Sequence, residues 1–330
     1  MTGSSVIDWH RLNLPDPTLA RRFIENHELY LDQPKDRGFM QQVQRDSVSY
    51  LRRHFNFKIP KPIENATIEQ LLQIASGHGH RQVCACTVLK AMQIINHMAG
   101  RELLFRLPVS DRDLFHLVEE KVYRIVGTML SEGFPITEFI GGRKNLDSTY
   151  TKLLSRPEAT AAALYDKLRF RIVTRTRDDV LPVLLYLTEQ LFPFNYVVPK
   201  QSTNTIFDWH QLFREHSNWD SVRSRLQTPL ESSFAPNDNR FTAPSYRVVQ
   251  FVTEVPVRVP PHLMELAPPG SESLGPIVYV LCEFQILDAQ SEAVNETGDA
   301  SHDRYKQRQR NAVFRRLRGG DRPRGPASDR

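Results

Sequence analysis

The pattern of apolar and polar positions divides the chain near residue 135. Before it, apolar residues recur at helical spacing behind residues that favour helix starts. We expect helices after Asp16–Pro17, over Phe39–Phe55, over Ile68–Ala75 behind a Thr67 cap, over Val83–Met98 with a C-cap at Gly100, and after Ser110, which forms a capping box with Asp113. The pattern therefore predicts a helical N-terminal domain at residues 1–135.

Beyond residue 135, runs of β-branched and aromatic residues alternate with helical segments. We expect strands at 164–176, Phe194–Pro199, Tyr246–Val259 and from Ile277 onward, and a helix behind Asp178. This order predicts an α+β fold, with a mixed β-sheet flanked by helices.

The strand that begins at Ile277 contains a carboxylate, Glu283, within an otherwise apolar run. Strand alternation puts Val280, Cys282, Phe284 and Ile286 on one face, and Tyr279, Leu281, Glu283 and Gln285 on the other. An ionised carboxylate among apolar neighbours is costly unless it is paired or binds a metal, so we expect this second face to open on water or on ions. The plainer alternative, which a lone glutamate would favour, is a strand-end residue that faces solvent.

Two further groups of polar residues have a regular placement. Asp166 and Arg171 interrupt the apolar strand 164–176, where the plainer reading of Asp166 is a surface ion pair with a neighbouring cation. Lys144, Ser148 and Lys152 recur every four residues behind two glycines, which on a helix gives one cationic stripe. Taken alone, that stripe is typical of a solvated helix face.

Together these residues follow an order that resembles the RelA/SpoT nucleotidyltransferase domain over roughly residues 140–310. The family reads E-x-Q-I-R-T and then A-E-x-G-x-A-x-H-x-x-Y-K, and this chain has E-F-Q-I-L-D from Glu283 and E-T-G-D-A-S-H-D-R-Y-K from Glu296. Upstream, the family's K-x-x-x-S-x-x-x-K is matched from Lys144, and its D-L-A-G-I-R-I by D-K-L-R-F-R-I from Asp166. Its D-Y-I-x-x-P-K is matched by N-Y-V-V-P-K from Asn195, one residue shorter.

The resemblance implies a nucleotidyltransferase-like fold and an Mg²⁺-dependent pyrophosphokinase. Such an enzyme moves the β,γ-pyrophosphate of ATP to the 3′-hydroxyl of a guanosine nucleotide, as (p)ppGpp synthetases do, and needs cations for the phosphates and carboxylates for the metal. Asp166 and Glu283 would be catalytic and would hold the Mg²⁺, and Glu283 would also help to deprotonate the hydroxyl. The residues implied to bind nucleotide are Lys144, Ser148, Lys152 and Arg171 for ATP, Lys200, Tyr246 and Gln285 for the acceptor, and His302 and Lys306, which would close the site.

Several positions depart from the family pattern. Gly142 occupies the slot of the family's arginine, and Arg143 is displaced by one position to adjoin the lysine. Arg169 stands where glycine is usual, so that either a close backbone approach is lost or a cation is gained. The other departures are Asn195 for aspartate, Leu287 for arginine and Asp288 for threonine. The chain therefore resembles a divergent branch.

The family's next motif, N-G-Y-x-S-x-H, has two competing registers here. Asn204–His210 keeps the Asn and His, whereas Pro244–Gln250 keeps the tyrosine as Tyr246. We prefer the second, because the fold needs a strand just before 277–288. This makes 201–244 an insertion, with a helix near 205–227, in a domain spanning 136–310. Tyr246 would then stack on the acceptor guanine, or else pack against a neighbouring strand.

The composition is that of an ordinary globular protein, with 40% apolar and 25% charged residues. No apolar run approaches the roughly 20 residues that span a bilayer, and the N-terminus lacks the basic-then-apolar order of a signal peptide. The chain has only three cysteines, an odd number that does not form the framework of a disulfide-rich protein, which indicates a reducing compartment. We therefore expect a cytoplasmic protein without a membrane partner.

Positive charge is concentrated at the C-terminus. Residues 304–330 carry ten Lys and Arg against two Asp, a net charge of +8, which leaves −3 on residues 1–303 because the whole chain carries +5. We predict that residues 311–330 form a basic disordered tail, which is either a solvated terminus or an RNA contact through phosphates.

Four soft metal ligands also lie close together, at His78, His80, Cys84 and Cys86. Their spacing lacks the two separated pairs usual in zinc sites, and a helix would turn the two cysteines to different faces. We interpret the cysteines as small apolar side chains, with a zinc site as the alternative.

Two functional classes remain open. One is the pyrophosphokinase, whose acceptor is GDP, GTP, GMP or, as in some toxins of the family, the 3′ end of tRNA. The other is a catalytically degenerate nucleotide-binding regulatory module whose N-terminal helices dock a partner. Carboxylates within about 5 Å of each other would favour the enzyme, and a Lys or Arg between them would favour the degenerate module. The histidine array of alarmone hydrolases has no counterpart upstream, so no hydrolase activity is expected.

Overall fold

The computed structural model describes residues 12–14, 16–143, 145–155, 168–208, 243–297 and 299–318, with the backbone alone at Leu146, Pro199, Lys200 and His302. The first part consists of helices: α1 (Pro17–Asn26), α2 (Pro34–Phe55), α3 (Lys61–Glu64), α4 (Ile68–Ala75), α5 (His80–Arg106) and α6 (Asp111–Ser131). The remaining helices are α7 (Leu146–Ser155), α8 (Val180–Gln190), α11 (Pro261–Met264), α12 (Ala289–Thr297) and α13 (His302–Leu317).

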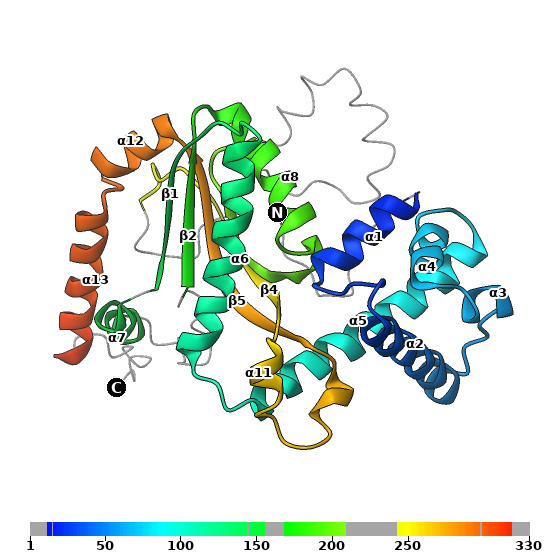
Figure 1. The fold of residues 1–330 in the computed structure, drawn as a ribbon. Helices are drawn as coiled ribbons and strands as arrows, with labels where there is room; N and C mark the ends of the chain where they lie inside the picture. Colours follow the sequence, from blue (N-terminus) through cyan, green and yellow to red (C-terminus); the bar gives the residue numbers. More distant parts are fainter. Residues whose placement is uncertain are drawn as a thin grey trace, which may run out of the picture.

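A mixed five-stranded sheet forms the centre of the second part (Figure 1). Its order is β1 (Ile136–Arg143), β2 (Leu168–Thr174), β5 (Ile277–Asp288), β4 (Val249–Arg258) and β3 (Val197–Asn204). β2 and β5 are parallel, and the other neighbours are antiparallel. The predicted α+β fold, with a mixed sheet flanked by helices and preceded by a helical region, is confirmed.

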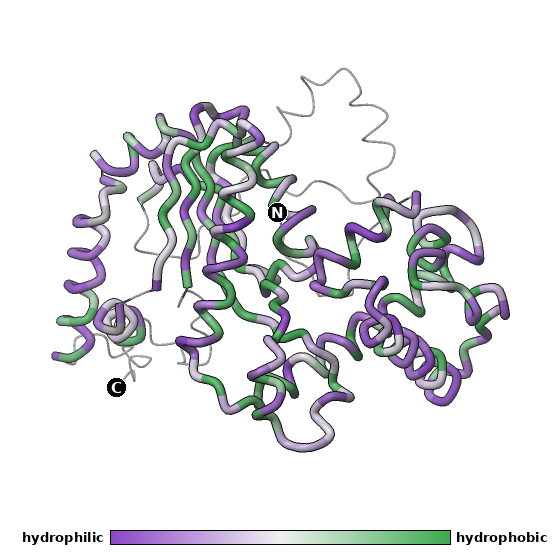
Figure 2. The backbone as a smooth tube through the Cα atoms, in the orientation of Figure 1, coloured by the Kyte–Doolittle hydropathy of each residue, from purple (hydrophilic) through white to green (hydrophobic). Residues whose placement is uncertain are grey.

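The two faces of β5 have different partners, as strand alternation predicts. Val280, Cys282, Phe284 and Ile286 belong to the main core, together with residues of α6 and α8. On the other face, Ile277 and Tyr279 belong to a second core, which is built mainly from α1 to α5. Helix α12 contacts β5 and β2, and α13 contacts α7. Figure 1 shows α6 across the sheet, and α1 to α4 at the opposite end of the molecule from α13. Figure 2 shows apolar residues concentrated along the central strands.

Local capping signals place most helix starts correctly. Asp16 accepts hydrogen bonds from the amides of Thr18 and Leu19, and both Thr67 and Ser110 form capping boxes. The predicted C-cap at Gly100 is wrong, because α5 continues to Arg106. Gly100 is instead a contact point between α5 and β5, where a side chain would meet Tyr279.

Other element ends differ from the expected ones. β4 begins at Val249, three residues after the predicted start, and residues 201–204 of the predicted insertion belong to β3. Residues 209–242 of that insertion lie outside the described residues. The predicted disordered tail begins too early, because α13 continues to Leu317, with Ala312 buried. No helix within the described residues is long and apolar enough to cross a bilayer, and the cytoplasmic location remains a prediction.

Candidate functional site

The candidate site lies on β2 and β5, on the face of the sheet opposite the main core. Arg169 is in register with Glu283, and Arg171 is in register with Gln285. The two residues between them, Phe170 and Phe284, belong to the main core, so alternation sends these four polar side chains to the other face. Glu283 and Gln285 are only 3% and 4% exposed, so their polar groups need partners within the protein.

The four side chains form a continuous chain of contacts. Nε of Arg169 lies 3.1 Å from Oε1 of Glu283, and Nε2 of Gln285 donates to the same oxygen at 2.8 Å. Nε of Arg171 donates to Oε1 of Gln285 at 3.2 Å. The expectation that the face of Glu283 opens on ions is confirmed, and the alternative of a solvent-facing glutamate is wrong.

Helix α12 adds further carboxylates to this face. It follows β5 directly, and Asp288 accepts hydrogen bonds from the amide and the hydroxyl of Ser291 in its first turn. Nη1 of Arg171 lies 2.8 Å from Oε1 of Glu292 and 3.7 Å from Oε1 of Glu296. Arg171, which the resemblance assigns to ATP, is therefore neutralised by α12 in this arrangement.

Tyr246 precedes β4, and its pKa is influenced by these charges. The Asn295 side chain of α12 exchanges two hydrogen bonds with the backbone of Arg247, which fixes the adjacent segment against α12. Burial raises the pKa of Tyr246, while Arg171 and Arg169 lower it and Glu283 raises it.

The predicted site residues are only partly brought together. Arg171, Glu283 and Gln285 share one region of the sheet face, and Tyr246 is linked to them only through the charges that shift its pKa. Ser148 and Lys152 lie on α7, which packs against α13, and Lys306 is exposed on α13. Lys144 and Asp166 lie outside the described residues, and the side chains of Lys200 and His302 are not described.

Two residues of this region were not predicted as site residues. Glu292 lies four residues before the matched glutamate Glu296, and no motif indicates that it binds Arg171. Arg169 was noted only as a departure from glycine, yet it is the ionic partner of Glu283. The alternation of charged and apolar residues in L-R-F-R-I, 168–172, was the signal that would have placed Arg169 and Arg171 on one face.

The zinc alternative near His80 receives no support from the described residues. Sγ of Cys84 lies 3.7 Å from Nδ1 of His80, and Cys86 contacts the carbonyl oxygen of Ala75 instead. Within the described part of the chain, no group of three or more His, Cys, Asp or Glu side chains is placed to hold a metal ion. Cys84 is buried, as interpreted, and Cys86 is half-buried.

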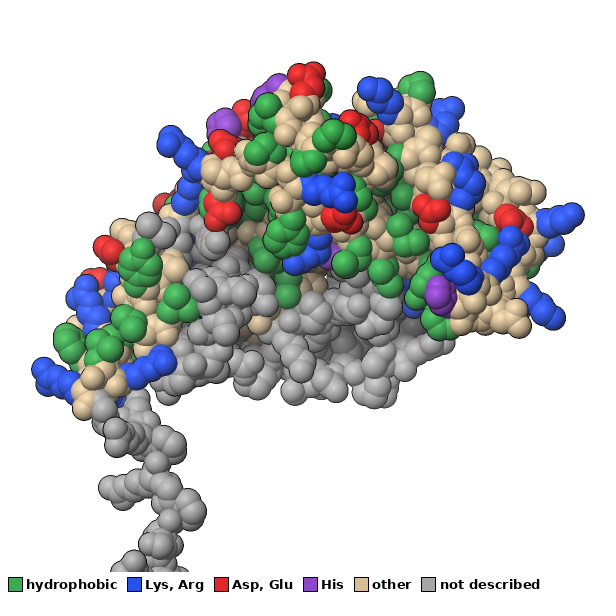
Figure 3. All heavy atoms as spheres, turned by 90° about the horizontal axis from the view of Figure 1, so that it is seen from below, with side chains coloured by type: hydrophobic (Ala, Val, Ile, Leu, Met, Phe, Trp, Pro, Cys, Tyr) green, Lys and Arg blue, Asp and Glu red, His purple; other side chains and the backbone are tan. Residues whose placement is uncertain are grey.

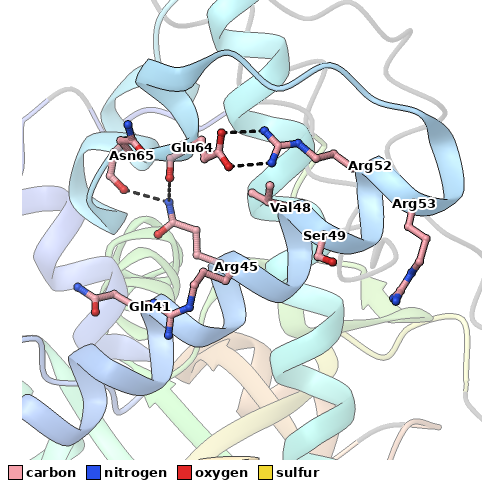
Figure 4. Close-up of a pocket in the computed structure, with 10 residues that line it drawn as sticks. Gln41, Arg45, Val48, Ser49, Arg52, Arg53, Glu64 and Asn65 are labelled. Atoms are coloured by element: carbon pink, nitrogen blue, oxygen red, sulfur yellow. Dashed lines mark hydrogen bonds and ion pairs between the residues drawn. The ribbon is translucent and has the colours of Figure 1, made fainter.

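A second concave region lies in the N-terminal helices, with a volume of about 690 Å³. Figure 4 shows Arg52 of α2 in a forked ion pair with Glu64, beside the exposed side chains of Arg45 and Arg53. In Figure 1, α2 and α3 stand far from β2. This groove is therefore separate from the site on β2 and β5.

The C-terminal helix presents a cationic surface. In Figure 3, Lys and Arg side chains gather beside apolar ones at the left end of the molecule, where α13 lies. The exposed cations of this helix include Arg304, Lys306, Arg310 and Arg315. Arg304 pairs with Asp299, and Arg316 donates to the carbonyl oxygens of Leu153 and Leu154 at the end of α7.

Comparison with known proteins gives matches among solved structures alone. No family model and no curated protein matches the chain. Small alarmone synthetase 1 from Bacillus subtilis, bound to its product pppGpp, is 16% identical over 64% of this chain and 88% of its own, with a TM-score of 0.32. Small alarmone synthetase 2 from the same organism is 14% identical over 66% of this chain and 94% of its own, with a TM-score of 0.33. A GTP pyrophosphokinase family protein from Streptococcus pneumoniae is 15% identical over 62% of this chain and 84% of its own, with a TM-score of 0.29.

These structures come from the family that the motif order resembles. At such identities and TM-scores they carry no argument about what this chain does, which has to rest on its own residues.

Proposed function

We propose that this chain transfers the β,γ-pyrophosphate of ATP to the 3′-hydroxyl of a guanosine nucleotide. The observation that supports this is the register of β2 and β5, which sets Arg171 beside Gln285 and close to Glu283. Residues that the resemblance assigns to the donor, to the acceptor and to catalysis thus share one face of two adjacent strands, and the charges of Arg171, Arg169 and Glu283 influence the pKa of Tyr246.

The carboxylates suit a divalent ion in their chemistry. Oxygen ligands of Asp and Glu are those that Mg²⁺ prefers, and we assign the ion to Glu283 and to Asp166, which precedes β2 by two residues. When bound, Mg²⁺ would neutralise charge on the transferred phosphates. Arg169 competes for the same carboxylate oxygen, so its guanidinium must withdraw before Glu283 can serve as a metal ligand.

The reaction itself is an in-line displacement. Glu283 would accept the proton of the 3′-hydroxyl, the 3′-oxygen would form a bond to the β-phosphorus, and the bond from that phosphorus to the oxygen of AMP would break. Arg171, once released from Glu292, would hold the phosphates of ATP with Lys144, Ser148 and Lys152. Lys200, Tyr246 and Gln285 would orient the acceptor, with His302 and Lys306 contributed by α13.

The ion pair of Arg169 with Glu283 favours a second candidate, the catalytically degenerate nucleotide-binding module. A guanidinium on a buried carboxylate occupies the position that a metal ion needs. In that case the same face would bind nucleotides without transfer, and the chain would act by regulation.

One experiment separates the two candidates. The full chain is incubated with labelled ATP, Mg²⁺ and GDP, GTP, GMP or tRNA in turn, and AMP release is measured; binding of a non-hydrolysable ATP analogue is measured separately by calorimetry. Release by the wild type that Glu283→Gln abolishes supports the enzyme, and the productive acceptor identifies its substrate. Equal release by both proteins contradicts the catalytic assignment, and binding without release supports the degenerate module.

A further inference from the structure

The groove in the N-terminal helices holds more positive charge than its own acid balances. Its described lining includes three arginines of α2, Arg45, Arg52 and Arg53, and one carboxylate, that of Glu64. Both oxygens of Glu64 are taken by Arg52, at 2.7 Å each. Arg45 donates to the neutral amide oxygen of Gln42, and Arg53 makes no hydrogen bond or ion pair with any residue that the structure describes. Two guanidinium groups of the groove therefore have no anionic partner among the described residues.

The groove is held in shape by contacts of its own lining. Gln44 of α2 is 7% exposed, and its side-chain amide donates to the carbonyl oxygens of Glu64 and Ala66 on the opposite wall, at 3.3 and 3.0 Å. Val48 and Ala66, which are both buried, add apolar surface to the lining. Because the two walls are joined in this way, a ligand would meet a preformed concave site, as is usual for small molecules.

The dimensions of the groove favour a small molecule that is charged at both ends. Its volume of about 690 Å³ lies within the range of about 300–1,000 Å³ that is typical of small-molecule sites. Arg45 and Arg53 are eight residues apart, which on a helix is about 12 Å along the axis. Figure 4 shows their side chains toward opposite ends of the groove, with Val48 and Ser49 between them. A single phosphate ion would therefore contact only one of the two arginines.

We propose that this groove binds a small organic molecule that carries two phosphate groups, one held by Arg45 and the other by Arg53. The planar fork of a guanidinium group matches the oxygens of a phosphate group, and such charge-assisted contacts are among the strong hydrogen bonds of proteins. A nucleic-acid strand fits less well, because its phosphates repeat along the chain and the Glu64 carboxylate of the groove would repel a further one. The site is separate from the face of β2 and β5 and does not depend on pyrophosphate transfer.

The test uses fructose 1,6-bisphosphate as the probe, which is titrated into the full chain by calorimetry at about 0.15 M salt. It should bind at least tenfold more tightly than inorganic phosphate, because the second phosphate group binds at a high effective concentration once the first is held. Arg45→Gln and Arg53→Gln should each lower the affinity for the bisphosphate at least tenfold, the loss expected for one charge-assisted contact. Both arginines are exposed, so neither substitution should disturb the fold.

Two further variants serve as a gain of affinity and as a control. Glu64→Gln removes the one carboxylate among the described lining residues and releases Arg52, so the affinity for the bisphosphate should rise several-fold. Arg112→Gln removes the same charge as the groove variants, but from an exposed position at the start of α6 that does not line the groove. It should leave the affinity for the bisphosphate unchanged.

The proposal is overturned if the bisphosphate binds no more tightly than inorganic phosphate, or if Arg45→Gln and Arg53→Gln bind it as the wild type does. A loss of the same size in Arg112→Gln also overturns it, since the loss would then reflect the overall charge of the chain. Binding of a single-stranded oligouridine that both groove variants weaken, without binding of the bisphosphate, would assign the groove to RNA instead. Should a groove variant fail to fold, the wild-type preference for the bisphosphate and the gain in Glu64→Gln decide, and the absence of either refutes the site.

Discussion

The contact of α5 with β5 at Gly100 offers a quantitative test of the fold. A Cβ added at Gly100 would lie 2.5 Å from Cε2 of Tyr279 and 2.6 Å from the carbonyl oxygen of Ile277. Neither atom is free to move, because the oxygen belongs to the backbone of β5 and the Tyr279 ring is 4% exposed. The Tyr279 hydroxyl also accepts hydrogen bonds from Asn96 and Tyr196, at 2.9 and 3.0 Å.

The expected effect of Gly100→Ala is the difference of two terms. Alanine is favoured over glycine inside a helix by about 1 kcal/mol. Overpacking of a close-packed site costs about 1–3 kcal/mol, and three contacts below 3 Å put Gly100 at the upper end of this range. We therefore expect Gly100→Ala to lower the free energy of unfolding by about 2 kcal/mol.

Denaturant unfolding followed by circular dichroism measures this change. The matched control is Gly127→Ala, on the exposed side of α6, where no atom lies within 4 Å of an added Cβ. The control should raise the free energy of unfolding by about 1 kcal/mol, since the propensity term alone applies. If Gly100→Ala is as stable as the wild type, or if both substitutions stabilise equally, α5 does not pack on β5 as described.

Three further predictions concern other contacts. Burial lowers the pKa of His27 from 6.5 to about 4, so as the pH falls the unfolded chain takes up a proton at this residue before the folded chain does. The free energy of unfolding should therefore fall between pH 6.5 and pH 4, by up to about 3 kcal/mol. Denaturant unfolding at a series of pH values measures this slope, which His27→Gln should flatten. Lys121→Ala should cost about 3 kcal/mol of unfolding free energy, because it removes the buried ammonium group that lies 2.7 Å from Glu28, whose side chain is only 13% exposed. A loss below about 1 kcal/mol would contradict the pairing. Arg316→Ala should speed hydrogen exchange of α7 amides, with Arg310→Ala as the control that leaves them unchanged.

Local signals in the sequence predicted the parts of the fold that depend on local chemistry. The caps at Asp16, Thr67 and Ser110 were correct because a helix start is decided by residues within one turn. The faces of the strand that begins at Ile277 were correct because alternation is a property of the strand itself.

The wrong or missing predictions concern residues whose structure depends on a contact with a part of the chain that is distant in sequence. A glycine after an apolar run is typical of a helix end, and the sequence therefore predicts one at Gly100. In the structure, the missing side chain of Gly100 allows the Tyr279 ring of β5 to pack directly against α5. Strand β1 was not predicted, because Gly141 and Gly142 break its pattern; Gly141 packs closely against the ring of Phe170. The ion pair of Arg169 depends on the register of two strands that are over 100 residues apart in sequence, which no local pattern contains.

Strand β5 also explains why helices outside the motif region belong to the same fold. Ile277 and Tyr279 pack into the N-terminal helical core, and Glu283 and Gln285 lie further along the same face of the strand. Tyr279 and Glu283 are four residues apart, which on a strand is about 13 Å. The N-terminal helices therefore cover the near half of the face whose far half carries the candidate site. Burial of this near half allows the far half to remain polar, because the strand is anchored by Tyr279 and does not depend on apolar packing around Glu283.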